Sequence, residues 1–316
     1  MLTFLGLAVG LVGLFFGGDW LVKGASRLAE SLGISPLVVG LTVVALGTST
    51  PELLVSLSAA LSGSSDISVG NVLGSNIANV GLILGISGLI YPIKVNVILL
   101  KREIPLMLII TLGTFWLFRD TLVSRTDGTI LVIGLVAFVS FMIFASLRER
   151  DKTYDIPEEK RATPTDVNRL KEGTRLLVGI LVLMVGAQLT VENATTLARN
   201  AGISELVIGI TLIAVGTSLP ELVTSVMAAF RQESDIAIGN VVGSNIFNLL
   251  GILGVTAIVQ PINVAQATIN FDAIVMLVFS VLVLPFALDR VLGRIEAGLF
   301  LIGYIAYNLY VVFGSL

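Results

Sequence analysis

The chain has 316 residues, of which 55% are hydrophobic and 13% charged, and its mean hydropathy is +0.98. This composition excludes a soluble globular domain and indicates an integral membrane protein. The net charge of -3 says little about partners because most charges lie in a few loops. The sequence contains no Cys and no His, which excludes disulfides, thiolate or imidazole metal sites, haem ligation and histidine proton relays.

Apolar segments of about 20 residues recur along the chain, which suits membrane-spanning helices and not the shorter strands of outer-membrane barrels. The first segment lacks the basic region and cleavage site of a signal peptide, so we interpret it as a span. The ten predicted spans are residues 2–25, 36–61, 67–91, 103–118, 128–147, 174–198, 205–230, 236–260, 271–288 and 294–314. We therefore expect an all-α integral membrane protein with ten transmembrane helices.

A polar segment separates the first five spans from the last five. It is rich in Lys, Glu, Asp and Pro and has no apolar periodicity, which predicts a loop or a short surface helix. The chain then divides into a first five-helix repeat (1–147), a linker (148–173) and a second five-helix repeat (174–316). The linker is too short to fold alone, so we expect no regulatory domain.

The distribution of Lys and Arg predicts the orientation, because cytoplasmic loops retain basic residues. With the N-terminus outside, about sixteen of them fall in cytoplasmic loops and three outside. We expect both termini outside and the linker in the cytoplasm, in a plasma or inner membrane.

An internal repeat is the strongest feature of the sequence. Residues 33–85 align without a gap with residues 202–254, and roughly 31 of 53 positions are identical, which shared hydrophobicity alone does not produce. Since five spans separate equivalent points, the second copy enters the membrane from the opposite side, as in transporters with inverted repeats.

Each copy places a helix-breaking proline and a glutamate inside an apolar run, predicting that spans 2 and 7 are broken. The motifs are Gly47-Thr48-Ser49-Thr50-Pro51-Glu52 and Gly216-Thr217-Ser218-Leu219-Pro220-Glu221. A carboxylate at membrane depth is costly and by default marks an ion or substrate path. Proline has no N–H to donate, so each break frees backbone carbonyls beside the motif hydroxyls. Paired broken helices indicate a transporter's central site, and oxygen-only ligands favour Ca2+ or Na+ over transition metals.

A second repeated motif follows in the next span of each half, at Gly70–Asn79 and Gly239–Asn248. Its glycines, spaced four apart, allow close helix packing. Ser75 and Asn79 lie on one helical face, and so do Ser244 and Asn248, because each pair is separated by four residues. Each helix can therefore present a hydroxyl and an amide oxygen to the broken helix opposite.

These two motifs make the chain resemble the sodium/calcium exchanger branch of the cation/calcium exchanger superfamily, whose alpha-repeats carry GTS-x-PE and GN-x-x-GSN-x-x-N patterns. The resemblance covers both repeats and implies a prokaryotic type without a regulatory domain. It implies cation ligation by Glu52 and Glu221, by Thr48 and Thr217 through side chains and carbonyls, and by Ser49, Ser218, Ser75, Ser244, Asn79, Asn248 and the carbonyls of Ala45 and Ala214. Of these, Ca2+ is expected on Glu52, Glu221, Thr48 and Thr217.

The resemblance implies antiport of about three Na+ for one Ca2+ by alternating access, with spans 1 and 6 sliding past a rigid core. Both Asn79 and Asn248 are amides, whereas potassium-dependent relatives carry an aspartate, notably in the second repeat.

A calcium/proton antiporter is the alternative to sodium/calcium exchange. A channel would sooner repeat around its pore axis, and an intramembrane enzyme would need a nucleophile with a base. We expect no enzyme activity, cofactor, nucleic acid or obligate protein partner, only the lipid bilayer and small inorganic cations.

Other polar residues receive structural interpretations. Asp19 is expected to pair with Lys23 one helical turn away, with a role in the site or in a gate as the alternative. Asp66 and Asp235 are expected to cap spans 3 and 8. The remaining amides of the second motif are interpreted as interhelical hydrogen-bond partners, namely Asn71, Asn76, Asn240 and Asn245.

Overall fold

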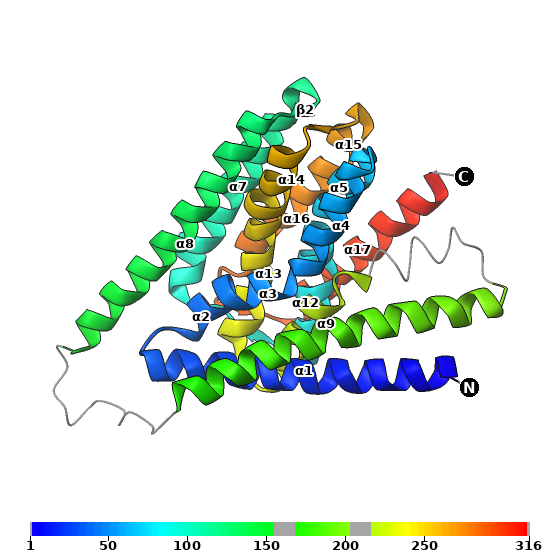
Figure 1. The fold of residues 1–316 in the computed structure, drawn as a ribbon. Coiled ribbons are helices and arrows are strands. Elements are labelled where there is room, and N and C mark those ends of the chain that lie inside the picture. The colour runs from blue at the N-terminus through cyan, green and yellow to red at the C-terminus, as the bar shows by residue number, and fades with distance from the viewer. Residues whose placement is uncertain (1, 155–167, 203–215, 315–316) are drawn as a thin grey trace.

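The computed structural model describes residues 2–154, 168–202 and 216–314, and this part of the chain is almost entirely helical (Figure 1). The first half contains α1 (Leu2–Leu32), α2 (Pro36–Val39), η1 (Gly40–Val44), α3 (Ala45–Thr48), α4 (Thr50–Leu61), α5 (Ser65–Ala78), η2 (Asn79–Leu84), α6 (Gly85–Ile90), β1 (Ile93–Lys94), η3 (Leu99–Glu103), α7 (Ile104–Leu117), η4 (Phe118–Asp120), β2 (Leu122–Val123) and α8 (Arg125–Tyr154). The second half contains α9 (Arg169–Asn200), α12 (Leu219–Phe230), α13 (Ser234–Phe247), η7 (Asn248–Ile252), α14 (Leu253–Val259), β3 (Ile262–Asn263), α15 (Gln266–Asn270), α16 (Asp272–Phe286), β4 (Val291–Leu292) and α17 (Arg294–Gly314).

The membrane spans agree with the sequence prediction wherever the structure describes them. Within the described residues, seven helices are long and apolar enough to cross a membrane, and a bent pair adds an eighth. The predicted fourth span corresponds to η3 and α7, and α12 forms the second half of the predicted seventh. The first half of that seventh span lies outside the described residues, so a break there and the count of ten remain predictions.

The predicted break in span 2 is confirmed. Residues 36–48 and 50–61 form two helical segments bent by 44° at Ser49. Pro51 sits in the first turn of α4, where its missing N–H costs nothing. The glutamate that follows is thereby placed at the N-terminus of a half-helix, in the middle of the span.

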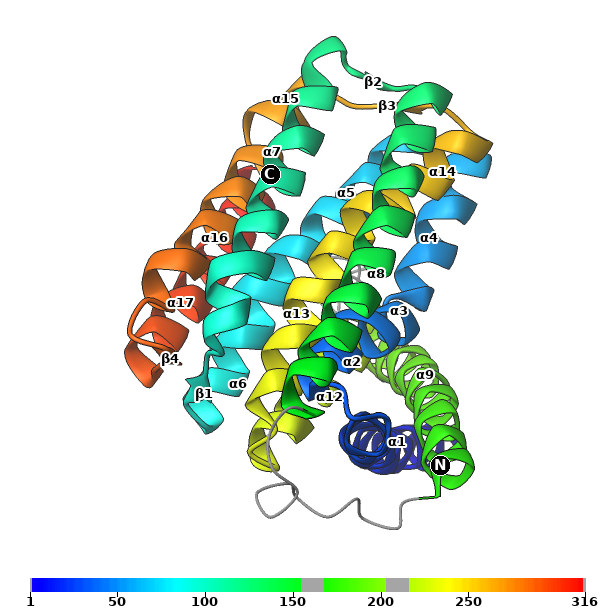
Figure 2. The ribbon, with the colours of Figure 1, turned by 90° about the vertical axis from the view of Figure 1, so that its left-hand side faces the viewer.

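Helices α1 and α9 form a pair that lies across the other helices, side by side in Figure 1 and nearly end-on in Figure 2. They contain 31 and 32 residues, about 46–48 Å at about 1.5 Å per residue, which exceeds a hydrocarbon core of about 30 Å and requires a strong tilt. Glycines line their interface: a Cβ at Gly17 would lie 2.6 Å from Leu183 N, and one at Gly179 would lie 2.5 Å from Leu21 N. The two backbones therefore touch, which ties the helices into one unit.

The buried side chains form two separate apolar clusters. The larger joins the central helices α5, α7, α13, α16 and their neighbours, with Phe118 and Phe300 among its fully buried members. The smaller contains Leu14, Leu21 and Leu183 and joins the α1–α9 pair to the broken helix and to α12. The paired helices thus rest on the central bundle through a cluster of their own.

Repeat symmetry extends well beyond the aligned motifs. Two short strand pairs were not anticipated by the all-α prediction: Ile93 pairs with Leu292, and Val123 with Ile262. Both obey the offset of 169 residues, so one pair is the repeat image of the other. The described residues with positive φ form three repeat pairs in the same way, namely Gly33 with Gly202, Gly63 with Gln232, and Thr121 with Arg290.

Connecting segments gather at two opposite ends of the molecule. One end, which we call the linker end, holds β1 and β4, the start of α13 at Ser234, and Ser31, whose carbonyl accepts a hydrogen bond from Arg169. The other end holds β2 and β3 beside the start of α5. Helices α4 and α12 therefore leave the centre in opposite directions, as an inverted repeat requires (Figure 1).

The helices beside the linker are longer than the sequence suggested, because α8 continues to Tyr154 and α9 begins at Arg169. The capping prediction was wrong. The N-cap positions of α5 and α13 are Ser64 and Glu233, and Asp66 and Asp235 lie inside the first turn. Carboxylates there still interact favourably with the positive end of the helix dipole.

Candidate cation-binding site

The two glutamates meet at the centre of the molecule, as the sequence predicted. Glu52 and Glu221 each lie in the first turn of a half-helix and are 1% exposed. Ser49 Oγ donates to Glu221 Oε1 at 2.8 Å, and Ser218 Oγ donates to Glu52 Oε1 at 3.4 Å. Each half therefore holds one oxygen of the other half's carboxylate.

The threonines of the two breaks flank these carboxylates. Thr48 is buried beside Glu221, and Thr217 lies beside Glu52. Thr48 Oγ1 lies 3.4 Å from the carbonyl of Ala45 and 3.2 Å from Asn240 Oδ1. The Ala45 carbonyl also accepts a hydrogen bond from the Ser49 N–H at 3.0 Å. A cation bound to this carbonyl would therefore share it with the Ser49 N–H and the Thr48 hydroxyl. Ala214 lies outside the described residues.

Four asparagines form a symmetric network between α5 with its continuation η2 and α13 with its continuation η7. Asn79 Nδ2 donates to Asn245 Oδ1, and Asn248 Nδ2 donates to Asn76 Oδ1, both at 2.9 Å. These bonds use the amide nitrogens of Asn79 and Asn248 and leave their oxygens for another partner. Mutation of a neighbouring group that orients a metal ligand in this way typically lowers metal affinity or activity by about 10- to 100-fold.

Buried acceptors without donors define the centre of the site. Within the described part of the chain, no hydrogen bond reaches Glu52 Oε2, Glu221 Oε2, Asn79 Oδ1 or Asn248 Oδ1. The hydroxyl of Ser244 is likewise unpaired there, and Ser75 is buried one turn from Asn79. A buried unpaired polar group costs about 1–3 kcal/mol, and more when charged. These four acceptors occupy positions related by the repeat, and a cation bound among them would offset this cost.

Two serines support the broken helices and were missed by the sequence analysis. Asn71 Nδ2 donates to the Glu52 carbonyl at 3.0 Å and to Ser56 Oγ at 2.8 Å. Asn240 makes the equivalent bonds to the Glu221 carbonyl and Ser225 Oγ, at 3.3 and 3.0 Å. The interpretation of these amides as interhelical partners is confirmed. The serines are identical in the aligned repeats, which was the available signal.

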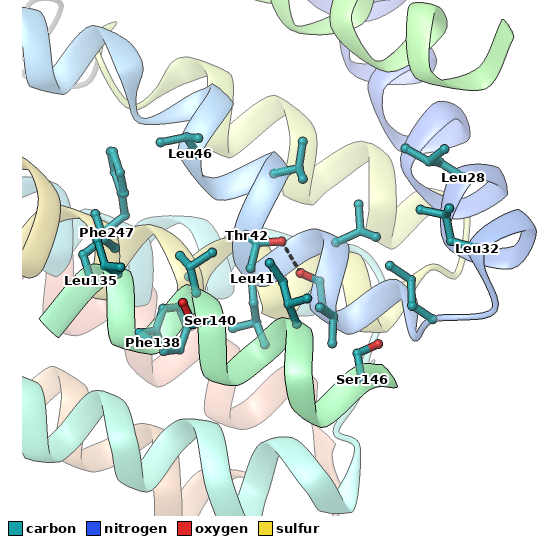
Figure 3. A pocket seen from close by; sticks show the side chains of 18 residues that line it. Leu28, Leu32, Leu41, Thr42, Leu46, Leu135, Phe138, Ser140, Ser146 and Phe247 are labelled. Carbon is teal, nitrogen blue, oxygen red and sulfur yellow. Dashed lines mark hydrogen bonds between the residues drawn. The ribbon is translucent and has the colours of Figure 1, made fainter. Parts of the chain in front are cut away.

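Two further cavities lie near the broken helices, and one of them is lined by residues of both breaks. One of about 430 Å3 lies between α9 and the two breaks and is lined by Pro51, Thr217, Pro220, Gln188 and Glu192, among others. The other, of about 620 Å3, lies between α8 and the segments α1 to α3 (Figure 3). Its lining is mainly Leu, Val and Phe, and its Thr42 hydroxyl is bonded to the Val38 carbonyl, so it has no set of cation ligands.

The fold and the site together define a class of protein. A helical membrane protein with two inverted halves, a central break, and paired carboxylate and amide oxygens at the meeting point of the halves is a secondary transporter for cations.

Comparisons with known proteins agree with this assignment to cation transporters. The family model described as "Sodium/calcium exchanger protein" matches residues 2–144 and 174–313. The chain is 38% identical over 311 residues to the putative antiporter CaxA of Alkalimonas amylolytica, covering 97% of each chain. It is 36% identical over 319 residues to the sodium/calcium exchanger MaX1 of Methanosarcina acetivorans, covering 90% of this chain and 91% of the relative. A solved structure of the sodium-calcium exchanger NCX_Mj superposes with a TM-score of 0.85 at 34% identity, covering 98% of this chain and 99% of that one.

The chain belongs to the sodium/calcium exchanger family. It is therefore a multi-pass membrane protein of a family of transporters that exchange cations, calcium among them.

Proposed function

We propose that this protein exchanges Na+ for Ca2+ across the membrane by alternating access. The observation that carries the proposal is the set of four buried acceptor oxygens from Glu52, Glu221, Asn79 and Asn248. Hard cations such as Ca2+ and Na+ prefer such ligands, and each half supplies one carboxylate and one amide. Hydroxyls and carbonyls of the breaks would complete the coordination, those of Thr48, Thr217, Ser49, Ser218, Ser75, Ser244, Ala45 and Ala214.

Charge balance explains why the exchange would be obligatory. Two ionised glutamates give the site a formal charge of -2, which one Ca2+ or two Na+ would neutralise. Buried charges without compensation carry a large desolvation cost, so a partly loaded site would cross between states slowly. The family resemblance implies about three Na+ per Ca2+, the third balanced in part by surrounding dipoles.

The α1–α9 pair is the element proposed to move. It is internally tied by backbone contacts at its glycines and rests on the central bundle through a separate apolar cluster. The cavity of about 430 Å3 between α9 and the breaks offers a route to the site from that side. Sliding of the pair over the bundle would cover this route and open its repeat counterpart along α1.

We further propose that the linker end faces the cytoplasm and both termini lie outside. Lys94 and Arg290 belong to the linker end, whereas Arg119 and Arg125 flank β2 at the other. The excess of basic residues at the linker end supports this orientation under the positive-inside rule.

The test is uptake of radioactive Ca2+ into proteoliposomes under an outward Na+ gradient or an outward proton gradient. Uptake driven by Na+ alone, and abolished in Glu221→Gln, is the expected result. Glu296→Gln, which alters a carboxylate at the start of α17 remote from the site, should transport normally. Uptake driven by the proton gradient would replace the proposal with calcium/proton antiport, and uptake independent of both gradients would reject exchange.

A further inference from the structure

One polar cluster breaks the twofold repeat symmetry of the molecule. At the linker end, Asp19 of α1 forms two salt bridges. One is with Lys23 at 2.9 Å, and the other is with Arg231, which follows α12. Beside them, Ser26 Oγ of α1 donates to Glu233 Oε1 at 2.8 Å. We call these five residues the ionic latch. The predicted Asp19–Lys23 pair is thus confirmed, but its contact with Arg231, 212 positions away, was not anticipated.

Among the described residues, the repeat counterparts of the latch keep a bond along their own helix but make no contact between helices like those of Asp19 with Arg231 and Ser26 with Glu233. Gln188 and Glu192 occupy the positions of Asp19 and Lys23 and bond to each other along α9. Ser62 occupies the position of Arg231 and bonds to the carbonyl of Ser58 in its own helix. Thr195, the counterpart of Ser26, is 7% exposed, and its hydroxyl has no partner in the described part of the protein.

The asymmetry coincides with a difference in packing at the two ends. Where α9 passes the breaks, Gln188 and Glu192 line the cavity that reaches Thr217 and Pro220. Where α1 passes α12, a Cβ at Gly18 would lie 2.9 Å from Val223 Cγ1 and 3.1 Å from Met227 Cγ. Lys23, Ser26, Arg231 and Glu233 of the latch line a separate cavity of about 390 Å3, and no residue of the two breaks lines it. Asp19 is only 10% exposed, so its charge depends on Lys23 and Arg231 for compensation.

We propose that the ionic latch holds α1 against the end of α12 and so stabilises the state in which the cation path is closed at the linker end. Because the other end carries no equivalent among the described residues, the latch sets an unequal balance between the two access states. The cation in turn shifts this balance only by its differential affinity for the two states. The role of the latch in transport rests on the exchange function proposed above.

The test uses the absence of Cys from the chain, which allows single-cysteine labelling in an otherwise native protein. Met227→Cys places a half-buried thiol against Gly18, next to Asp19 of the latch, and Lys94→Cys places an exposed thiol at the linker end. Modification by a charged, membrane-impermeant thiol reagent is followed in lipid nanodiscs. In Arg231→Ser, which installs the residue found at the repeat position, the thiol at position 227 should react about tenfold faster, a shift of about 1.4 kcal/mol. The thiol at position 94 should react at an unchanged rate.

Three variants guard against a merely structural effect. Arg231→Lys keeps the charge and should restore slow labelling at position 227. Ser26→Ala removes only the hydrogen bond to Glu233 and should accelerate labelling by a smaller factor. Arg294→Ser removes an equal charge at the start of α17 and should leave the rate unchanged. Unaltered labelling in both Arg231→Ser and Ser26→Ala, or equal acceleration in Arg294→Ser, overturns the latch.

Ca2+ uptake by the same variants separates this inference from the proposed function. Faster labelling in Arg231→Ser without Na+-driven uptake in the parent protein would uphold the latch and reject sodium/calcium exchange. Na+-driven uptake with unchanged labelling in the latch variants would uphold sodium/calcium exchange and reject the latch.

Discussion

At the scale of residues, the site depends on which atom of each amide faces the centre. Asn79 and Asn248 present an oxygen because the opposite helix occupies their nitrogens. Spacing along the sequence places these side chains on the correct face, but it does not reveal their rotation. The rotation is fixed by Asn245 and Asn76, which were correctly predicted to be interhelical hydrogen-bond partners, although the sequence does not show which atoms they bind.

Substitution of Asn76 by Ala should therefore weaken cation binding without contact between Asn76 and the cation. The Asn248 amide would lose the acceptor for its nitrogen and could turn that nitrogen toward the site. We expect a loss of about 10- to 100-fold in apparent Ca2+ affinity, measured by uptake kinetics, typical of lost ligand-orienting partners.

Ser87→Ala is the matched control for this prediction, because Ser87 is fully buried in the neighbouring helix α6 and its hydroxyl has no partner among the described residues. An equal loss of affinity in both variants, or a fall in thermal stability that accounts for it, would refute the orienting role.

At the scale of elements, the break in the second span interrupts the helical hydrogen bonds at the position where the proposed site lies. Replacing Pro51 by Ala allows the Gly47 carbonyl to regain a helical N–H donor and removes the residue that disfavours a continuous helix. We expect thermal stability to be kept or raised, while Na+-driven Ca2+ uptake falls at least about tenfold as carbonyls and Glu52 leave their positions.

Pro285→Ala provides the comparison, since Pro285 lies inside α16 and outside the two repeated motifs. It should leave uptake unchanged. Normal uptake in Pro51→Ala would show that the break is not required.

The α1–α9 interface predicts a second effect at this scale. A Cβ at Gly179 would meet the backbone of Leu21 at 2.5 and 2.9 Å, and backbone atoms cannot move aside cheaply. Gly179→Ala should cost about 1–3 kcal/mol of stability, seen as a lower unfolding temperature in detergent. Gly173→Ala on the same helix has no atom within 4 Å of the added carbon and should not destabilise the protein. Equal stability of the two variants would contradict a tight backbone contact.

The positions of the helices could be predicted from the sequence more accurately than their ends or the contacts between distant residues. The spans, the break at Pro51 and the meeting of Glu52 with Glu221 follow from hydropathy, proline chemistry and the repeat. The two-residue strands were missed because they are too short to show alternation, and Arg231 was missed because an ion pair across 212 residues leaves no local pattern. The helical extension of α8 was missed because its polar end carries no apolar periodicity.

At the scale of the whole molecule, the grouping of loops at two ends predicts opposite accessibility. Asp120→Cys near β2 should react with an impermeant thiol reagent added to intact cells. Gln232→Cys, at the linker end, should react only after the membrane is permeabilised. The reverse pattern would invert the proposed orientation without affecting the fold, and both residues reacting in intact cells would contradict their placement at opposite ends.

The crossed amide bonds also bear on whether one half of the chain could exist alone. Each half completes the other: Asn79 relies on Asn245, Asn248 relies on Asn76, and the serines of the breaks reach across to the opposite carboxylate. A five-helix unit alone in lipid would expose these groups where water cannot satisfy them. A single five-helix copy would therefore need a second, oppositely inserted copy to satisfy these groups, and in this chain the linker keeps the two complementary copies together.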